Sequence, residues 1–88
     1  MELKDAFEKA AIDSKTLPAK PDNETLLKLY SLYKQGSIGD INIDPPANAF
    51  DFVAKAKFSA WEALKGKSTE EAMTEYIALV NQLKGYKF

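Results

Sequence analysis

The chain of 88 residues contains no cysteine, no histidine and no arginine. Without cysteine it has no disulfides, thiolate metal sites or thiol nucleophiles, which fits a cytoplasmic location. Without histidine it lacks the commonest general base and the commonest zinc ligand, so we expect neither a metal site, nor a cofactor, nor an enzyme. All 12 basic residues are lysine and the formal net charge is −1. Nucleic-acid binding is therefore not expected, because it normally needs a basic face.

Long apolar runs are also missing. None approaches the roughly 18 to 20 residues of a membrane-spanning helix. The N-terminal stretch MELKDAFEKAA mixes acids with lysines and has no apolar signal core. Hydrophobic residues make up 45% and charged residues 28%, which is a globular composition. We expect one monomeric domain over residues 1–88, with at most transient contact with membranes.

Apolar spacing and punctuating residues predict two helices in the first half of the chain. The first should run from Leu3 to about Lys15, because small and apolar side chains recur on one face. The second should begin near Asp22 and stop at Gly39, with a last turn weakened by Gly36.

The second half of the chain predicts a long loop and two further helices. Two adjacent prolines and no periodicity mark residues 41–50 as an ordered loop. A third helix should then reach about Lys65 and end at Gly66. Ser68, with Glu71 three residues later, forms a capping box for a fourth helix, which is the clearest in the chain. Four helices without a strand pattern predict an all-α four-helix bundle, and the loop lengths permit an up-down-down-up order.

One cluster of polar side chains stands out on the second helix. Helical spacing places Tyr30 and Tyr33 on one side, with Lys34 four residues after Tyr30. Tyrosine offers a stacking face and a hydroxyl, and lysine offers a point charge suited to phosphate, so the cluster could hold an anion with a flat ring beside it. From this chemistry alone, the favoured interpretation is that the tyrosines are half-buried packing residues and Lys34 is a solvated surface charge.

Two long blocks of the sequence resemble the acyl-CoA-binding protein family. The segment YSLYKQGSIGDIN, residues 30–42, is similar to the family's Y-S-x-Y-K-Q-A-T-x-G-D-x-N signature. The segment DFVAKAKFSAWEALKGKSTEEAMTEYI, residues 51–77, resembles the family's D-F-K-G-K-A-K-W-x-A-W-x-x-L-K-G-x-S-x-E-x-A-M-x-x-Y-I. The resemblance covers essentially the whole chain, and the blocks occur in the family's order with matching helix boundaries.

This resemblance implies an up-down-down-up bundle that binds long-chain fatty acyl-CoA esters without changing them, as an intracellular carrier and buffer. The family's contacts with the adenosine 3′-phosphate and the adenine ring, carried over by alignment, fall on Lys15, Tyr30, Tyr33, Lys34, Lys57 and Tyr76. The family's acyl groove, between the first helix and the start of the second, suggests Phe7, Ala10, Ala11, Leu26 and Leu27.

Some positions depart from the family pattern. Gly36 and Ser37 stand in place of alanine and threonine, which should loosen the end of the second helix. Val53 stands where many relatives have a lysine that helps with the ligand. The loop at residues 41–50 is also one residue longer than in close vertebrate relatives. Val53 and this altered loop motivate an alternative hypothesis, a helical protein-interaction or signalling module that has kept the fold and lost ligand binding.

Overall fold

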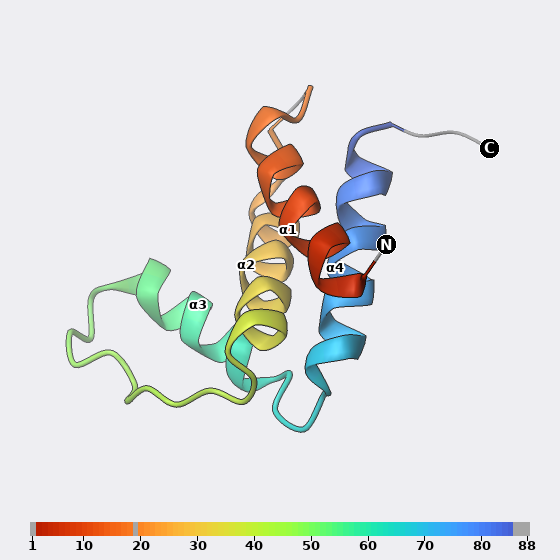
Figure 1. Cartoon of the computed structure of the whole chain (residues 1–88). Coiled ribbons are helices and arrows are strands. Elements are labelled where there is room, and N and C mark those ends of the chain that lie inside the picture. Colours follow the sequence, from red (N-terminus) through yellow and green to blue (C-terminus); the bar gives the residue numbers. More distant parts are fainter. Residues whose placement is uncertain (1, 19, 86–88) are drawn as a thin grey trace.

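The computed structural model describes residues 2–18 and 20–85, and within them the chain is all-α, as predicted. It forms four α-helices and one short 3-10 turn: α1 (Leu3–Asp13), η1 (Ser14–Thr16), α2 (Asn23–Ser37), α3 (Phe52–Glu62) and α4 (Thr69–Leu83). In Figure 1, α1 rises, α2 and α3 descend, and α4 rises again beside α1 and α2. The helix α2 packs against both α3 and α4, while α1 packs against α4.

Three of the helices begin at side-chain caps. The carboxylate of Asp22 accepts the Thr25 N–H at the start of α2, and Asp51 caps α3 in the same way. Ser68 accepts the N–H of Glu71 at 3.0 Å, which confirms the predicted start of α4. Each cap satisfies one of the backbone donors that a helix N-terminus leaves free.

Two helices end earlier than the sequence predicts, because their last turns tighten. The helix α1 stops at Asp13 rather than near Lys15, and the chain continues as the 3-10 turn η1. The helix α3 stops at Glu62 rather than near Lys65, and the backbone N–H groups of residues 64 and 65 bond to carbonyls only three residues back. Gly66 then reverses the chain with φ +94°, a conformation that favours glycine.

The main core lies between α1, α2 and α4. It is built from buried side chains on the facing sides of these three helices: Phe7, Ala10, Leu29, Leu32, Ala72, Tyr76 and Val80. On the other side of α2, the Trp61 side chain of α3 is 1% exposed. Its indole N–H donates to the carbonyl of Gly39 at 2.9 Å, which ties α3 to the end of α2.

Gly36 does not loosen the end of α2, contrary to the sequence prediction. The helix continues through it to Ser37, and Gly36 is buried. A Cβ atom at this position would lie 3.0 Å from Cζ of Phe7 and 3.2 Å from Cγ of Met73. The missing side chain therefore lets α1 and α4 approach the α2 backbone closely, which offsets the conformational entropy that glycine costs in a helix.

Substitution of Gly36 should consequently act through packing. We expect Gly36→Val to destabilise the fold by about 1–3 kcal/mol, because its methyl groups would force Phe7 out of its position. Ser37→Val in the same turn is the control, since Ser37 is exposed. Urea denaturation measures both. Equal stability of the two variants would contradict this account of Gly36.

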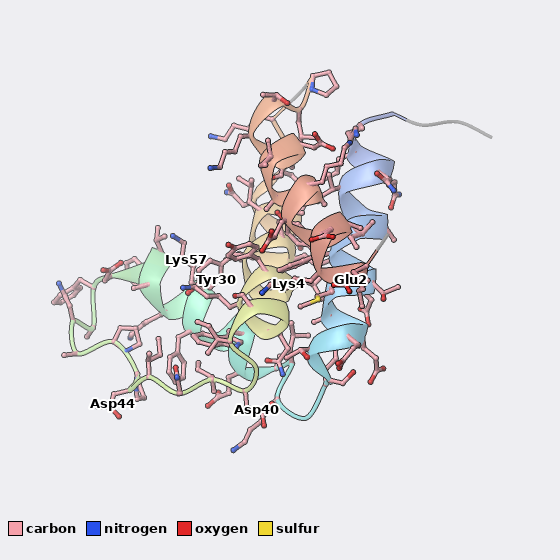
Figure 2. The ribbon with its side chains drawn as sticks, in the orientation of Figure 1. Glu2, Lys4, Tyr30, Asp40, Asp44 and Lys57 are labelled. Atoms are coloured by element: carbon pink, nitrogen blue, oxygen red, sulfur yellow. The ribbon has the colours of Figure 1, made fainter. Side chains whose placement is uncertain are left out.

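Asp40 joins the end of α2 to the turn that precedes α4. Its Oδ1 atom accepts the Gln35 side-chain amide at 2.9 Å and the Gly66 backbone N–H at 2.8 Å. Gln35 is fully buried and its amide also donates to the carbonyl of Lys67 at 2.8 Å. The hydrogen bond from Gly66, followed by that from Gln35, holds the pKa of Asp40 below its ordinary value of 3.8. Figure 2 shows Asp40 at this junction.

The Asp40 contacts predict a pH-dependent loss of stability. Asp40→Asn should lower stability near neutral pH, because a neutral amide accepts these hydrogen bonds more weakly than a carboxylate. Since the folded-state pKa is lowered, the stabilisation is present above the pKa of the unfolded chain and is lost as the pH falls through the folded-state value. Urea denaturation should show the two proteins converging below about pH 4. A gap that stays constant down to about pH 2 would contradict this role for Asp40.

Candidate functional site

An open cleft of about 630 Å³ lies where α1, η1, α2 and α4 meet. Four of the six residues that the resemblance assigns to a CoA head group line it: Lys15, Tyr30, Tyr33 and Tyr76. Its other lining residues are Glu8, Ala11, Ile12, Ser14 and Leu29. We call this hollow the aromatic cleft. It brings together side chains that lie as far apart in the sequence as Glu8 and Tyr76, because α1 and α4 pack side by side.

A group of three rings forms one wall of the aromatic cleft. The Phe7 ring stacks on Tyr33, with centroids 5.3 Å apart and planes 19° apart. It meets Tyr76 edge-on at 5.2 Å, and the two tyrosine rings are 5.8 Å apart. Such offset and edge-on contacts are the favoured arrangements of aromatic pairs. Phe7 is buried behind the wall, whereas Tyr33 is 41% exposed and presents a ring to the cleft.

Two lysines gather at the Tyr30 ring. The ammonium of Lys57, on α3, lies 5.3 Å from the ring centroid, and that of Lys34, one turn further along α2, lies 5.8 Å from it. Figure 2 shows Lys57 and Tyr30 facing each other from neighbouring helices. Lys34 is also 5.8 Å from the centroid of the Trp61 ring. Both cations thus lie within about 6 Å of the centre of one aromatic ring, which creates a positive site suited to an anion.

A hydroxyl pair lies in the aromatic cleft between α4 and η1. The Tyr76 hydroxyl donates to Oγ of Ser14 at 3.2 Å, and the Ser14 hydroxyl donates to the Ala11 carbonyl at 2.7 Å. Burial raises the pKa of Tyr76 above its ordinary value of 10.0, although the hydrogen bond to Ser14 acts in the opposite direction. Tyr76 is therefore a neutral phenol at physiological pH.

A second, smaller hollow of about 330 Å³ lies between the first turns of α2 and α3. We call it the apolar groove. It is lined by Asn23, Leu26, Leu27, Tyr30, Phe52, Val53, Ala56 and Lys57. Tyr30 lines both the groove and the aromatic cleft, so the two hollows meet at its ring. The structure thus places the apolar groove directly beside the two lysines at the Tyr30 ring.

The five residues expected in an acyl groove are separated into three places. Leu26 and Leu27 line the apolar groove, and Ala11 lines the aromatic cleft. Phe7 and Ala10 are buried in the core between the helices, at 3% and 4% exposure. The groove also lies between α2 and α3 rather than between the first helix and the start of the second. The alanine-rich face of α1 packs against α4, which explains why it is not available there.

Several residues of the two hollows were not identified from the sequence. Ser14 follows Ala10 and Ala11 on the inner face of the first helix, so its position could have been noticed, but its contact with Tyr76 depends on the packing of α4. Phe52, which was not identified, is 71% exposed at the rim of the groove, beside Val53 at 65%, whose position the family pattern already associates with the ligand. Two adjacent apolar residues in the first turn of a helix are the sequence feature that could have indicated the edge of a groove.

Within residues 2–18 and 20–85, acidic side chains do not cluster in threes as a metal site would require. None of the described helices is long and apolar enough to cross a membrane. The described site is a cleft with aromatic faces and cations, joined to an apolar groove. Such a site suits an amphiphile that has an anionic head, a flat ring and an apolar tail.

Comparisons with known proteins agree with a site for an amphiphile of this kind. The family model "Acyl CoA binding protein" matches residues 4–80. An acyl-CoA-binding protein of Ricinus communis is 49% identical over 85 residues, covering 97% of this chain and 93% of the relative. One of Dictyostelium discoideum is 53% identical over 77 residues, covering 88% and 90% respectively. The crystal structure of Oryza sativa acyl-CoA-binding protein 2 superposes with a TM-score of 0.86 at 44% identity, covering 92% of this chain and 87% of that one.

The chain belongs to the acyl-CoA-binding protein family. Its fold is the four-helix fold of that family, as the superposition shows. Family membership makes it a binding protein for acyl-CoA esters and not an enzyme.

Proposed function

We propose that the chain binds long-chain fatty acyl-CoA esters non-covalently, as a monomeric intracellular carrier and buffer that acts in the cytoplasm. One observation carries the proposal: the aromatic cleft and the apolar groove meet at Tyr30. A single ligand with a charged nucleotide head and an apolar tail would fill both hollows at once. A ligand that had only the head group would leave the apolar groove empty, and one that had only the tail would leave the aromatic cleft empty.

The head group is assigned to the six residues predicted from the sequence. Lys34 and Lys57, held at the Tyr30 ring, would receive the 3′-phosphate, because a phosphate monoester carries nearly two negative charges and accepts strong hydrogen bonds. Tyr33 offers its exposed ring to the adenine, with Tyr76 beside it. Lys15 lines the same cleft and would supply a further positive charge.

The acyl tail is assigned to the apolar groove. Leu26 and Leu27 form one side of it, and Val53 extends the apolar rim where many relatives have a lysine. Each methylene withdrawn from water contributes about 0.8 kcal/mol, so a long tail could match the nucleotide in binding energy. Val53 thus replaces a charged contact with apolar surface and leaves the cations at Tyr30 in place.

Partners follow from the same chemistry. The chain would exchange its ligand through transient contacts with membranes, because a carrier must meet membranes to load and unload its ligand. It would not bind nucleic acid, because its net charge of −1 provides no excess of positive charge for a polyanion.

Removing either cation at Tyr30 should weaken binding of palmitoyl-CoA. We expect Lys34→Gln and Lys57→Gln each to raise the dissociation constant roughly tenfold or more, because each removes a charge-assisted contact with the phosphate. Isothermal titration calorimetry measures the effect, and circular dichroism verifies that the helices persist.

The chain offers a matched control for each of these variants. Lys28→Gln on α2 and Lys55→Gln on α3 make the same change of net charge at exposed lysines that line neither hollow. Their dissociation constants should stay within about twofold of the original, since exposed and distant charges interact weakly. Unchanged affinity in both test variants, or equal losses in tests and controls, would contradict the assignment of the phosphate.

A further inference from the structure

The hydroxyl pair in the aromatic cleft has only one possible arrangement of protons. The carbonyl of Ala11 has no proton, so the 2.7 Å bond to it must use the proton of the Ser14 hydroxyl. The 3.2 Å contact between Ser14 and Tyr76 can then use only the proton of Tyr76. The hydrogen bonds therefore run in one direction, from Tyr76 through Ser14 to the Ala11 carbonyl.

This direction decides what Tyr76 can offer to a ligand. A phenol has one proton and can also accept hydrogen bonds through its oxygen lone pairs. Because the proton is directed to Ser14, the oxygen atom has only acceptor capacity left for the cleft. Burial raises the pKa of Tyr76, so the group remains a neutral phenol, and an acceptor of this kind matches a ligand N–H.

The lysines at the Tyr30 ring and the Tyr76 hydroxyl suit different parts of a ligand. Fully ionised phosphate oxygens only accept hydrogen bonds, so they can pair with the ammonium groups at Tyr30. They cannot pair with the Tyr76 hydroxyl while its proton is directed to Ser14, because its oxygen can then only accept as well. The ring of a nucleotide base can stack on an aromatic face such as that of Tyr33, which lies next to Tyr76. Tyr76 is thus placed to meet the edge of the base.

Building on the proposed function, we propose that Ser14 is a positioning residue that fixes the Tyr76 hydroxyl as an acceptor. The cleft then selects a nucleotide base that carries an amino group, as adenine does, over a base with a carbonyl at the same position. Ser14 acts through Tyr76 in this proposal. Without Ser14, the Tyr76 proton is free to turn towards a ligand carbonyl, and the selection is lost.

Two ligands that differ along one edge of the base test the proposal. Calorimetric titrations compare palmitoyl-CoA with its analogue in which hypoxanthine replaces adenine, so that a carbonyl replaces the amino group and the adjacent ring nitrogen gains a proton. The original chain should bind the analogue about tenfold more weakly, the effect of one unfavourable hydrogen-bonding pair. In Ser14→Ala this ratio should fall to about twofold or less, because Tyr76 can then donate to the carbonyl.

Three further variants make the test specific. Ser14→Thr keeps a hydroxyl and should restore the original ratio, and Tyr76→Phe should abolish the selection. Ser37→Ala removes a similar serine bond to a helix carbonyl, at 2.7 Å, from an exposed position outside the cleft, and should leave the ratio unchanged. If Ser14 served only the folding of the chain, Ser14→Ala would weaken the binding of both ligands equally and leave the ratio of their affinities unchanged.

The outcomes separate this inference from the proposed function. If the original chain binds both ligands equally well, or if Ser14→Ala keeps the tenfold ratio, the inference is overturned and the carrier function still stands. Should the original chain bind neither ligand, the carrier function itself fails and the inference fails with it. A ratio that falls in Ser14→Ala and returns in Ser14→Thr supports the inference.

Discussion

The contact of the Phe7, Tyr33 and Tyr76 rings is the interaction on which both the fold and the site depend. It joins α1, α2 and α4 in the core, and its two tyrosines form a wall of the aromatic cleft. Gly36 allows this contact to be close, because a Cβ atom there would lie 3.0 Å from Cζ of the Phe7 ring. The same rings thus contribute to core packing and to the proposed ligand site, so the close packing of the core also fixes the positions of the site's tyrosines.

The helix α3 adds the part of the site that the main core does not supply. It contacts α2 and carries Lys57 to the Tyr30 ring and Val53 to the rim of the apolar groove. Its position depends on the buried Trp61 and on the bonds that Asp40 makes across the following turn. A carrier must release its ligand as well as bind it, and a groove with an open, exposed rim is consistent with that requirement.

Local patterns predicted most of the fold. The all-α class and the cap at Ser68 followed from periodicity and from side chains that bond within one turn. The role of Gly36 could not be predicted, because the reason for it is Phe7 on another helix. For the site, the tyrosine and lysine spacing on α2 indicated the cluster, and the structure gathers it with Lys57. The Ser14 contact and the groove between α2 and α3 depend on tertiary packing, which spacing does not encode.

The most direct test of the account is calorimetric titration with palmitoyl-CoA and with palmitoyl-dephospho-CoA, which lacks only the 3′-phosphate. The account predicts one-to-one binding of the first ligand and binding of the second that is weaker by a factor of roughly a hundred, since two charge-assisted contacts are lost. Equal affinity for both ligands would contradict the assignment of the phosphate to the cations at Tyr30. Failure of both ligands to bind would contradict the proposed carrier function.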